Sequence, residues 1–559
     1  MNDRPIRQQT FLQGTAVLAM ATVLVKLMGF LFKVPLNNII GDTGFGYFNT
    51  AYDVYNVLLM ISTTGLPVAM SRMISEAKTL GNFAQIRRIY KTSLAAFLTI
   101  GIAGTLGMLI FCKPLSVMVT TNENSWAAIA ALAPCVLLIC LVSAYRGFFQ
   151  GQSDMTPTSV SQVFEALVRL VVGLGLAWLV MKLTGQAYVQ KNGIVLAAGE
   201  SAMQYGDLTL AAGGGILGVT AGSLVSVLYL RGRFKRASGV LAQSGGAVKT
   251  GRSTMKELLA IAIPITLGSA GLQIINLFDT MVYMRRLTGA LGWSDALADS
   301  AKGVYNFCQT VFALPCSFIP TITIAIIPAI TAAITRNDLR EARQTEESAV
   351  RTMGLIAMPC AAGLFVMAEP VIRLLCRSYS EDKIALAAPM MAILGLAVVF
   401  NSLVLLLNAI MQAHGDVITP VVNMLLGGIV KIVVNYILVG IPSIGIVGAP
   451  VGTLVCYMFI TALDVIAMRR SITSRPAIFK NLARPLAASA IMGAATWVAW
   501  QLLDRALPSR TIACLAALAF AVIVYVVLAV CLRCVTYADC MLLPKGEKIA
   551  KLLHIREKN

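Results

Sequence analysis

Basic side chains in the middle of three long apolar stretches could hold a negatively charged ligand. Lys26, Arg169 and Lys431 are each flanked on both sides by runs of apolar residues. An ionisable group at the centre of a membrane-spanning helix costs about 2.5 to 3.5 kcal/mol, so such residues pair with one another or line a substrate path. Lysine and arginine bind phosphate oxygens through charge-assisted hydrogen bonds. The three residues therefore predict a site for a phosphate-bearing anion.

A neighbouring acid offers a purely structural explanation for one of the three. Glu165 precedes Arg169 by one helical turn on the same face, which predicts an ion pair. Both interpretations of Arg169 stay open at this point. Lys431 has Gly427 at the equivalent position, and no acidic residue lies within one turn of Lys26. A role in ligand binding is therefore favoured for the two lysines.

Acidic and amide residues form stripes at helical spacing. They are Asn49, Asp53 and Asn56, then Gln273, Asn276 and Asp279, and finally Asn306 and Gln309. Spacings of three and four place each group on one helix face. Such a stripe either lines a watery cavity or bonds a neighbouring helix, and its recurrence in both halves of the chain favours the cavity. We predict four further substrate contacts: Asn56, Gln273, Asn276 and Gln309. The candidates for cation coupling or gating are Asp53, Asp279 and Glu165.

The elements that must position these residues are membrane-spanning helices. Of the 559 residues, 57% are hydrophobic and 13% are charged. A spanning helix needs about 20 mostly apolar residues, and about fourteen stretches of the chain meet this requirement, the eighth of them centred near Phe318. The polar interruptions are too short to bury a core of their own. The sequence predicts an all-α polytopic membrane protein with about 14 transmembrane helices.

An internal repeat divides the predicted helices into two related halves. Gln150, Asp154 and Arg169 recur at a constant offset of 262 positions as Gln412, Asp416 and Lys431. This duplication predicts two pseudo-symmetric six-helix lobes around a central site. The expected domains are residues 1–240, residues 241–475, two additional helices in residues 476–540 and a basic amphipathic tail in residues 541–559. The two aspartates are expected to cap the next helix rather than contact substrate.

The charge distribution predicts orientation and argues against several other functions. With both termini in the cytoplasm, the cytoplasmic segments carry most of the lysines and arginines. Basic loops beside anionic lipid account for the net charge of +19 without nucleic acid. Cys531 and Cys534 form a lone CxxC in a chain with two histidines, so no metal site is predicted. A glycosyltransferase usually needs a DxD motif, which the chain lacks. We therefore expect neither an enzyme nor a cofactor.

Several segments together resemble a known family. They are KLMGF at Lys26–Phe30, PLNNIIG at Pro35–Gly41, GLPVAMSRMISE at Gly65–Glu76, RGFFQGQSDMTPTSVSQVFEALVR at Arg146–Arg169 and KIVVNYILVG at Lys431–Gly440. This pattern resembles the polysaccharide-biosynthesis flippases related to stage V sporulation protein B, in the superfamily that also contains MATE transporters and lipid II flippases. The resemblance implies a bacterial plasma-membrane protein whose two lobes form a V, alternating access, and a central cavity lined chiefly by the first, second, seventh and eighth helices.

The resemblance also implies a substrate class. Lys26 falls where the family carries a basic residue in its first helix, whereas Leu59, Met60 and Ile61 stand where characterised lipid II flippases place an arginine. The predicted function is outward movement of a polyprenyl-pyrophosphate-linked saccharide. The two additional helices would form a groove for the lipid tail, or else support stability or oligomerisation. The expected partners are this anionic lipid-linked saccharide and membrane lipids, with no nucleic acid, and a monomer is compatible with these features. The alternative is a cation-coupled exporter of drugs or metabolites.

Overall fold

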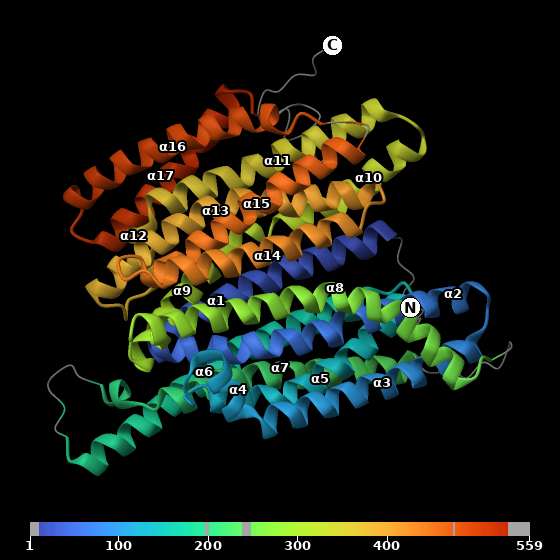
Figure 1. The fold of residues 1–559 in the computed structure, drawn as a ribbon, viewed down its shortest axis with the longest axis horizontal. Coiled ribbons are helices and arrows are strands. Elements are labelled where there is room, and N and C mark those ends of the chain that lie inside the picture. The colour runs from blue at the N-terminus through green and yellow to red at the C-terminus, as the bar shows by residue number, and fades with distance from the viewer. Residues whose placement is uncertain are drawn as a thin grey trace, which may run out of the picture. The chain divides into compact units, whose positions relative to one another are not determined.

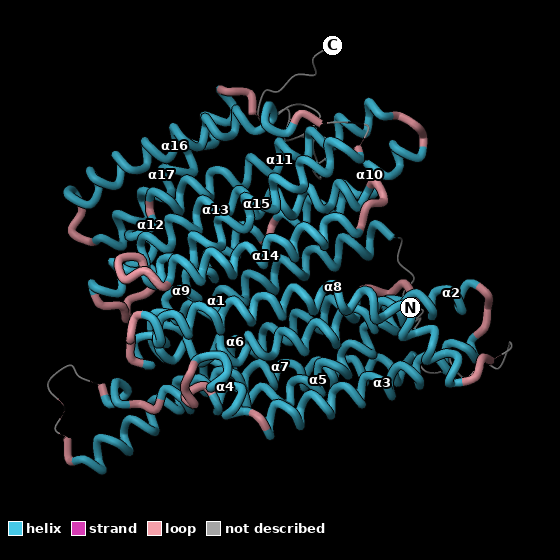
Figure 2. The backbone as a smooth tube through the Cα atoms, in the orientation of Figure 1, coloured by secondary structure: helices cyan, strands magenta, loops and turns pink. Residues whose placement is uncertain are grey.

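The computed structural model describes residues 11–194, 196, 201–237, 248–472, 474 and 476–534. The described part of the chain contains helices and loops and no strands (Figure 2). It forms two compact units, one ending at Phe307 and the other beginning at Cys308. The predicted boundary between the lobes, after residue 240, does not coincide with the boundary between these two compact units. It stays a prediction. The predicted basic helix in residues 541–559 lies outside the described residues.

The helices follow one another with short connections (Figure 1). Those that begin in the N-terminal unit are α1 (Phe11–Met60), η1 (Ile61–Gly65), α2 (Leu66–Thr79), α3 (Phe83–Ile110), α4 (Cys112–Thr120), α5 (Trp126–Gly151), α6 (Thr156–Asn192), η2 (Ala202–Tyr205), α7 (Leu208–Ala237), α8 (Gly251–Arg285), η4 (Arg286–Ala290) and α9 (Asp295–Cys316). Those of the C-terminal unit are α10 (Ile319–Thr335), α11 (Leu339–Val366), α12 (Ala368–Leu375), α13 (Glu381–Ala413), α14 (Ile418–Val439), η5 (Gly445–Val447), α15 (Gly448–Ser471), α16 (Ile478–Ala506) and α17 (Arg510–Cys531).

Twelve helical runs in the described residues are long and apolar enough to cross a membrane. The first run, Met20–Thr79, contains two of the predicted spans, which explains part of the difference from fourteen. The eighth predicted span corresponds to α9 and α10, which Ser317 and Phe318 interrupt, and neither half is among the twelve. The prediction of an all-α polytopic membrane protein is confirmed.

A single glycine separates the first two predicted spans. Gly41 has φ 68° and ψ 178°, inside a helix that is otherwise continuous. This region of φ/ψ space is essentially restricted to glycine, because a Cβ atom clashes with the backbone there. Figure 1 shows the two halves of α1 as separate rods. The chain therefore turns between two long helices without a loop.

Aromatic packing fixes the end of α5 inside the N-terminal unit. The rings of Tyr90, Phe148 and Phe234 have centroids 4.5 to 5.7 Å apart. They belong to a buried cluster contributed by α2, α3, α5, α7 and α8. Aromatic pairs of this kind contribute about 0.5 to 1.5 kcal/mol beyond their buried area. This packing holds the backbone next to Arg146, which lies two residues before Phe148.

Both repeated aspartates bond to the start of the next helix, as predicted. The Thr156 N–H donates to Asp154 Oδ1 at 3.2 Å, in the first turn of α6. The Thr419 N–H donates to Asp416 Oδ1 at 3.1 Å, in the first turn of α14. Each carboxylate satisfies a backbone donor that has no partner within its helix. The repeat therefore preserves a structural turn in both halves of the chain.

Candidate functional site

Basic side chains from α1 and α6 gather inside the N-terminal unit. Lys33 lies close enough to Arg169 and Lys26 for like-charge repulsion, and close enough to Asp53 for attraction. Lys26 is exposed, whereas Lys33 and Arg169 are half-buried. We call Lys26, Lys33 and Arg169 the basic cluster. An anion placed beside Lys33 would relieve its repulsion by both neighbours.

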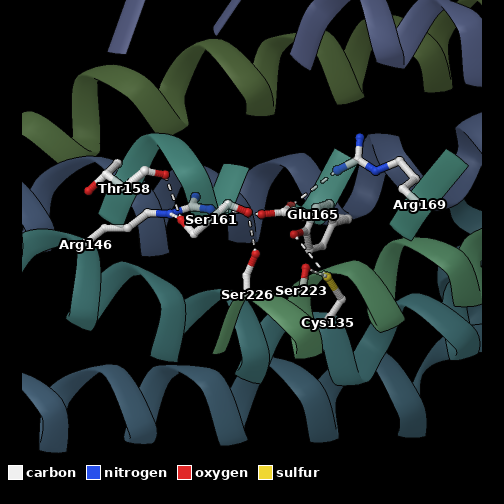
Figure 3. A network of polar contacts seen from close by, with 9 residues as sticks. Cys135, Arg146, Thr158, Ser161, Glu165, Arg169, Ser223 and Ser226 are labelled. Carbon is white, nitrogen blue, oxygen red and sulfur yellow. Dashed lines mark hydrogen bonds and ion pairs between the residues drawn. The ribbon is translucent and has the colours of Figure 1, made fainter. Parts of the chain in front are cut away.

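A carboxylate shared by two arginines forms the base of the cluster (Figure 3). Glu165 Oε2 accepts from Arg146 Nη2 at 3.1 Å, and Glu165 Oε1 accepts from Arg169 Nη2 at 3.3 Å. The side chains of Arg146 and Glu165 are 14% and 13% exposed. Arg169 Nε has no hydrogen-bond partner among the described residues. The predicted pair with Glu165 is confirmed, but one carboxylate balances only one of two guanidinium groups, so a positive charge remains.

Serine side chains hold this network in place between α5, α6 and α7 (Figure 3). Arg146 Nε donates to Ser161 Oγ at 3.0 Å, and Ser161 Oγ donates to the Thr158 carbonyl at 2.7 Å. Ser226 Oγ of α7 donates to the Ser161 carbonyl at 2.8 Å. These neutral contacts orient Arg146 without cancelling its charge. Arg146 is therefore a fixed positive charge behind Glu165.

A second ion pair links α1 to α9 within the same unit. Lys302 Nζ lies 2.9 Å from Asp53 Oδ2 and donates to Thr50 Oγ1 at 2.8 Å. The side chain of Lys302 is 0% exposed and that of Asp53 is 25% exposed. A lysine buried this completely requires a charged partner. Asp53 was predicted as a candidate for cation coupling, and here it faces the ammonium group of the protein's own lysine.

The backbones of α1 and α9 approach closely beside this pair. A Cβ atom on Gly303 would meet the Asp42 carbonyl oxygen, and one on Gly46 would meet the Asp299 carbonyl oxygen. Ser300 Oγ donates to Asp42 Oδ2 at the same crossing. Glycine at a helix crossing lets two backbones come together. The close contact holds Asp53 and Lys302 at bonding distance.

Adding one methyl group at this crossing is expected to separate the two helices. Gly303→Ala should lower the apparent melting temperature of the purified protein, because overpacking a tight contact costs about 1 to 3 kcal/mol. The matched control is Gly29→Ala in α1, where no atom lies within 4 Å of the added Cβ. There the higher helix propensity of alanine should raise stability slightly. Equal shifts for the two variants would show that the crossing is not tight.

The remaining predicted residues are placed individually. Asn56 and Gln273 are half-buried, Asn276 is exposed and Asp279 is buried within the N-terminal unit. Asn49 is satisfied inside its own helix, because its Nδ2 donates to the Phe45 carbonyl at 2.7 Å. Lys431 and Gln309 belong to the C-terminal unit and are both half-buried. The structure pairs Arg169 with Glu165 and places Lys26, Arg169 and Asp53 within electrostatic range of Lys33. Their roles, and the other assignments, stay predictions.

Three basic residues near the site are not among those that the sequence predicts. They are Lys33, Arg146 and Lys302. Lys33 lies seven residues after Lys26, a spacing that keeps both on one helix face and could have revealed it. Arg146 lies in the motif that carries the family resemblance, but its partner is 19 positions away across a turn. Lys302 and Asp53 are too far apart in the chain for any periodic signal.

Comparison with known proteins gives concordant matches. The family model described as polysaccharide biosynthesis protein matches residues 11–334, more than half of the chain, and the MatE model matches residues 264–437. Stage V sporulation protein B of Bacillus subtilis (strain 168) is 26% identical over 459 residues, which cover 82% of this chain and 83% of that protein. Lipid II flippase MurJ of the same strain is 25% identical over 498 residues, with 87% of each chain covered. The solved lipid II flippase MurJ in an inward closed conformation superposes with a TM-score of 0.64 at 12% identity, covering 92% of this chain and 98% of that one.

Proposed function

Because the chain belongs to the family of polysaccharide biosynthesis proteins, we propose that it is a flippase for a polyprenyl-pyrophosphate-linked saccharide. The coarser part of this statement follows from the relatives: the chain is a multi-pass membrane transporter related to lipid II flippase MurJ and stage V sporulation protein B. The substrate class is the proposal. It would be moved from the inner to the outer leaflet of the bacterial plasma membrane by alternating access, with both termini in the cytoplasm.

The observation that carries the proposal is the excess of positive charge in the basic cluster. Lys33 is repelled by both Lys26 and Arg169, and Glu165 is already divided between two arginines. Phosphate oxygens are strong acceptors for ammonium and guanidinium donors. A pyrophosphate carries enough negative charge to satisfy several of these groups at once. A neutral or cationic substrate would leave the repulsion in place.

Each group has an assigned role in this proposal. Lys26, Lys33, Arg169 and Lys431 bind the pyrophosphate. The saccharide contacts the amides of Asn56, Gln273, Asn276 and Gln309. The lipid tail stays in the bilayer. A membrane potential that is negative inside favours outward movement of an anion by about 2.3 kcal/mol per charge per 100 mV.

A second function has a specific observation in its favour. The match of residues 264–437 to the MatE model is compatible with a cation-coupled exporter of drugs or metabolites. Such an exporter requires acidic groups that are available to a cation. Asp53 faces Lys302 at 2.9 Å and Glu165 faces two arginines, which disfavours both as cation sites. We therefore retain the exporter as the alternative rather than the main proposal.

Translocation of a lipid-linked precursor in proteoliposomes tests the proposed function. The wild-type protein should move the precursor to the opposite leaflet, and Lys26→Ala or Lys431→Ala should strongly reduce this movement. Each variant removes one phosphate ligand, and a lost charge-assisted contact of about 1.5 to 3 kcal/mol corresponds to a reduction of roughly 10- to 100-fold. Efflux of an organic cation is measured in parallel with the same vesicles.

A charge-matched control separates loss of a ligand from loss of fold. Lys182, whose ammonium group lies 5.0 Å from the centre of the Trp178 ring, is remote from the basic cluster. Lys182→Ala should transport normally. Robust efflux of the organic cation without any precursor movement would refute the proposal and support the exporter. Normal precursor movement by Lys26→Ala and Lys431→Ala would remove these lysines from the site.

A further inference from the structure

The segment joining α15 to α16 in the C-terminal unit has an unbalanced charge. From Val465 to Leu503 the chain contains five basic residues and no acidic one. The basic residues are Arg469, Arg470, Arg475, Lys480 and Arg484. They fall at the end of α15, in the connection and in the first two turns of α16, although Arg475 lies outside the described residues. Two carboxylates of α11 bond to this connection, Glu346 to the Ser474 hydroxyl and Glu347 to the Ala477 N–H. The basic residues still outnumber these two acids, so this end of the helix pair attracts anions.

A pocket of about 570 Å³ opens where these two helices meet. Its lining includes Val465, Met468, Arg469, Pro476, Phe479 and Lys480. This volume lies within the range of about 300 to 1,000 Å³ that is usual for small-molecule sites. The lining thus combines cationic side chains with apolar ones in a single concavity. Nothing in the transport proposal uses this pocket.

The polar part of the pocket is suited to a phosphate group. Arg469 and Lys480 are exposed, and neither forms an ion pair with a residue that the structure describes. Both side chains line the pocket. The Ala477 N–H at the start of α16 is already bonded to Glu347 Oε1 of α11 at 3.1 Å. The phosphate site therefore rests on the two cations and not on the helix N-terminus.

The apolar part of the pocket is suited to a lipid rather than to a soluble anion. Phe479 is 63% exposed beside Lys480, and Met468 and Pro476 supply further apolar surface. Both α15 and α16 are candidate membrane spans, so their adjoining ends lie at the boundary between the hydrocarbon layer and the headgroups. An anionic phospholipid places a phosphate and an acyl chain next to each other at this boundary.

We propose that the pocket between α15 and α16 binds an anionic phospholipid of the cytoplasmic leaflet. The phosphate lies between Arg469 and Lys480, and an acyl chain lies along Phe479. The chain's own C-terminal segment is a poor occupant, since Lys545, Lys548 and Lys551 carry the same charge as the pocket. The bound lipid braces the additional helices α16 and α17 against α15. The connection is also held to α11, because the Ser474 Oγ donates to Glu346 Oε2 at 2.7 Å and the Ala477 N–H donates to Glu347 Oε1 at 3.1 Å.

Lipid retention and thermal stability of the full-length protein test this site. The purified protein is titrated with phosphatidylglycerol or phosphatidylcholine, and adducts are counted by native mass spectrometry. Phosphatidylglycerol should bind and raise the melting temperature of the wild type. Arg469→Gln/Lys480→Gln should bind phosphatidylglycerol at least about tenfold more weakly, because each basic residue near an anionic headgroup contributes to the binding free energy. Phosphatidylcholine should have little effect on either protein.

A matched control shows whether any loss of lipid binding comes from the pocket itself. Arg336→Gln/Arg340→Gln removes the same charge from exposed positions outside the pocket and should retain phosphatidylglycerol. Equal losses in the two double variants, or none in the pocket variant, would overturn the proposal. Inorganic phosphate that stabilises the wild type as much as the lipid does would also overturn it. If the pocket variant does not fold, Phe479→Ala provides the test: it keeps both charges and should still weaken lipid binding.

Discussion

Replacing Glu165 with glutamine is expected to lower the free energy of unfolding by about 3 to 5 kcal/mol. The carboxylate is 13% exposed and accepts from both Arg146 and Arg169. Glutamine keeps the size of the side chain but removes its charge, which leaves two half-buried guanidinium groups facing each other. The measurement is the shift of the melting temperature of the purified protein.

The same substitution at an exposed pair provides the control. Glu369 is 56% exposed and pairs with Arg373 at 2.9 Å one turn away. Glu369→Gln should cost less than about 1 kcal/mol, because water screens an exposed ion pair. A second readout separates structure from function. If the arginines are poised for an anion, added pyrophosphate should restore part of the stability of Glu165→Gln and none of that of Glu369→Gln. Similar melting shifts for the two variants would contradict the buried network.

The ion pair between Asp53 and Lys302 should respond unequally to loss of its two members. Asp53→Asn leaves the ammonium of Lys302 without a counterion in a completely buried position, which should cost about 3 to 5 kcal/mol. Lys302→Met leaves Asp53, which is 25% exposed and can be hydrated, so about 1 to 3 kcal/mol is expected. The melting temperatures of the two single variants test this: that of Asp53→Asn should be the lower.

The double variant supplies the sharper test of this pair. Asp53→Asn/Lys302→Met carries no unpaired charge and places a side chain of similar volume in the buried site. It should be more stable than Asp53→Asn alone, with an interaction energy of about 0.5 to 3 kcal/mol between the two positions. Additive losses would mean that the ammonium and the carboxylate do not depend on each other. Thr50 stays satisfied in every variant, because its hydroxyl also donates to the Gly46 carbonyl at 2.9 Å.

The sequence predicts the parts of this site that depend on local spacing. Glu165 and Arg169 lie one turn apart on a helix, and the structure confirms their contact. Asp154 and Asp416 each precede a helix, and both bond to its first turn. Hydropathy alone indicates the all-α membrane fold. In each of these cases the partners are joined by a few residues of regular backbone, so helix geometry determines where they meet.

The contacts that the sequence does not predict join residues that are distant in the chain. Arg146 reaches Glu165 across the turn between α5 and α6, and Lys302 reaches Asp53 from α9 to α1. Their geometry depends on how whole helices pack, which periodicity does not encode. Lys33 differs from these two, because Lys26 seven residues before it and Asn37 four residues after it lie at helical spacing and could have marked it.

The single-residue turn at Gly41 restricts how this chain can change in length. A loop between two helices absorbs an inserted or deleted residue, but α1 has none between its halves. Each residue gained or lost between Gly41 and Asp53 would rotate the following helix by about 100°. Thr50 and Asp53 would then no longer face Lys302, although every side chain would be unchanged. Between Gly41 and Asp53 the length of the chain is therefore as strictly constrained as the identity of its buried residues.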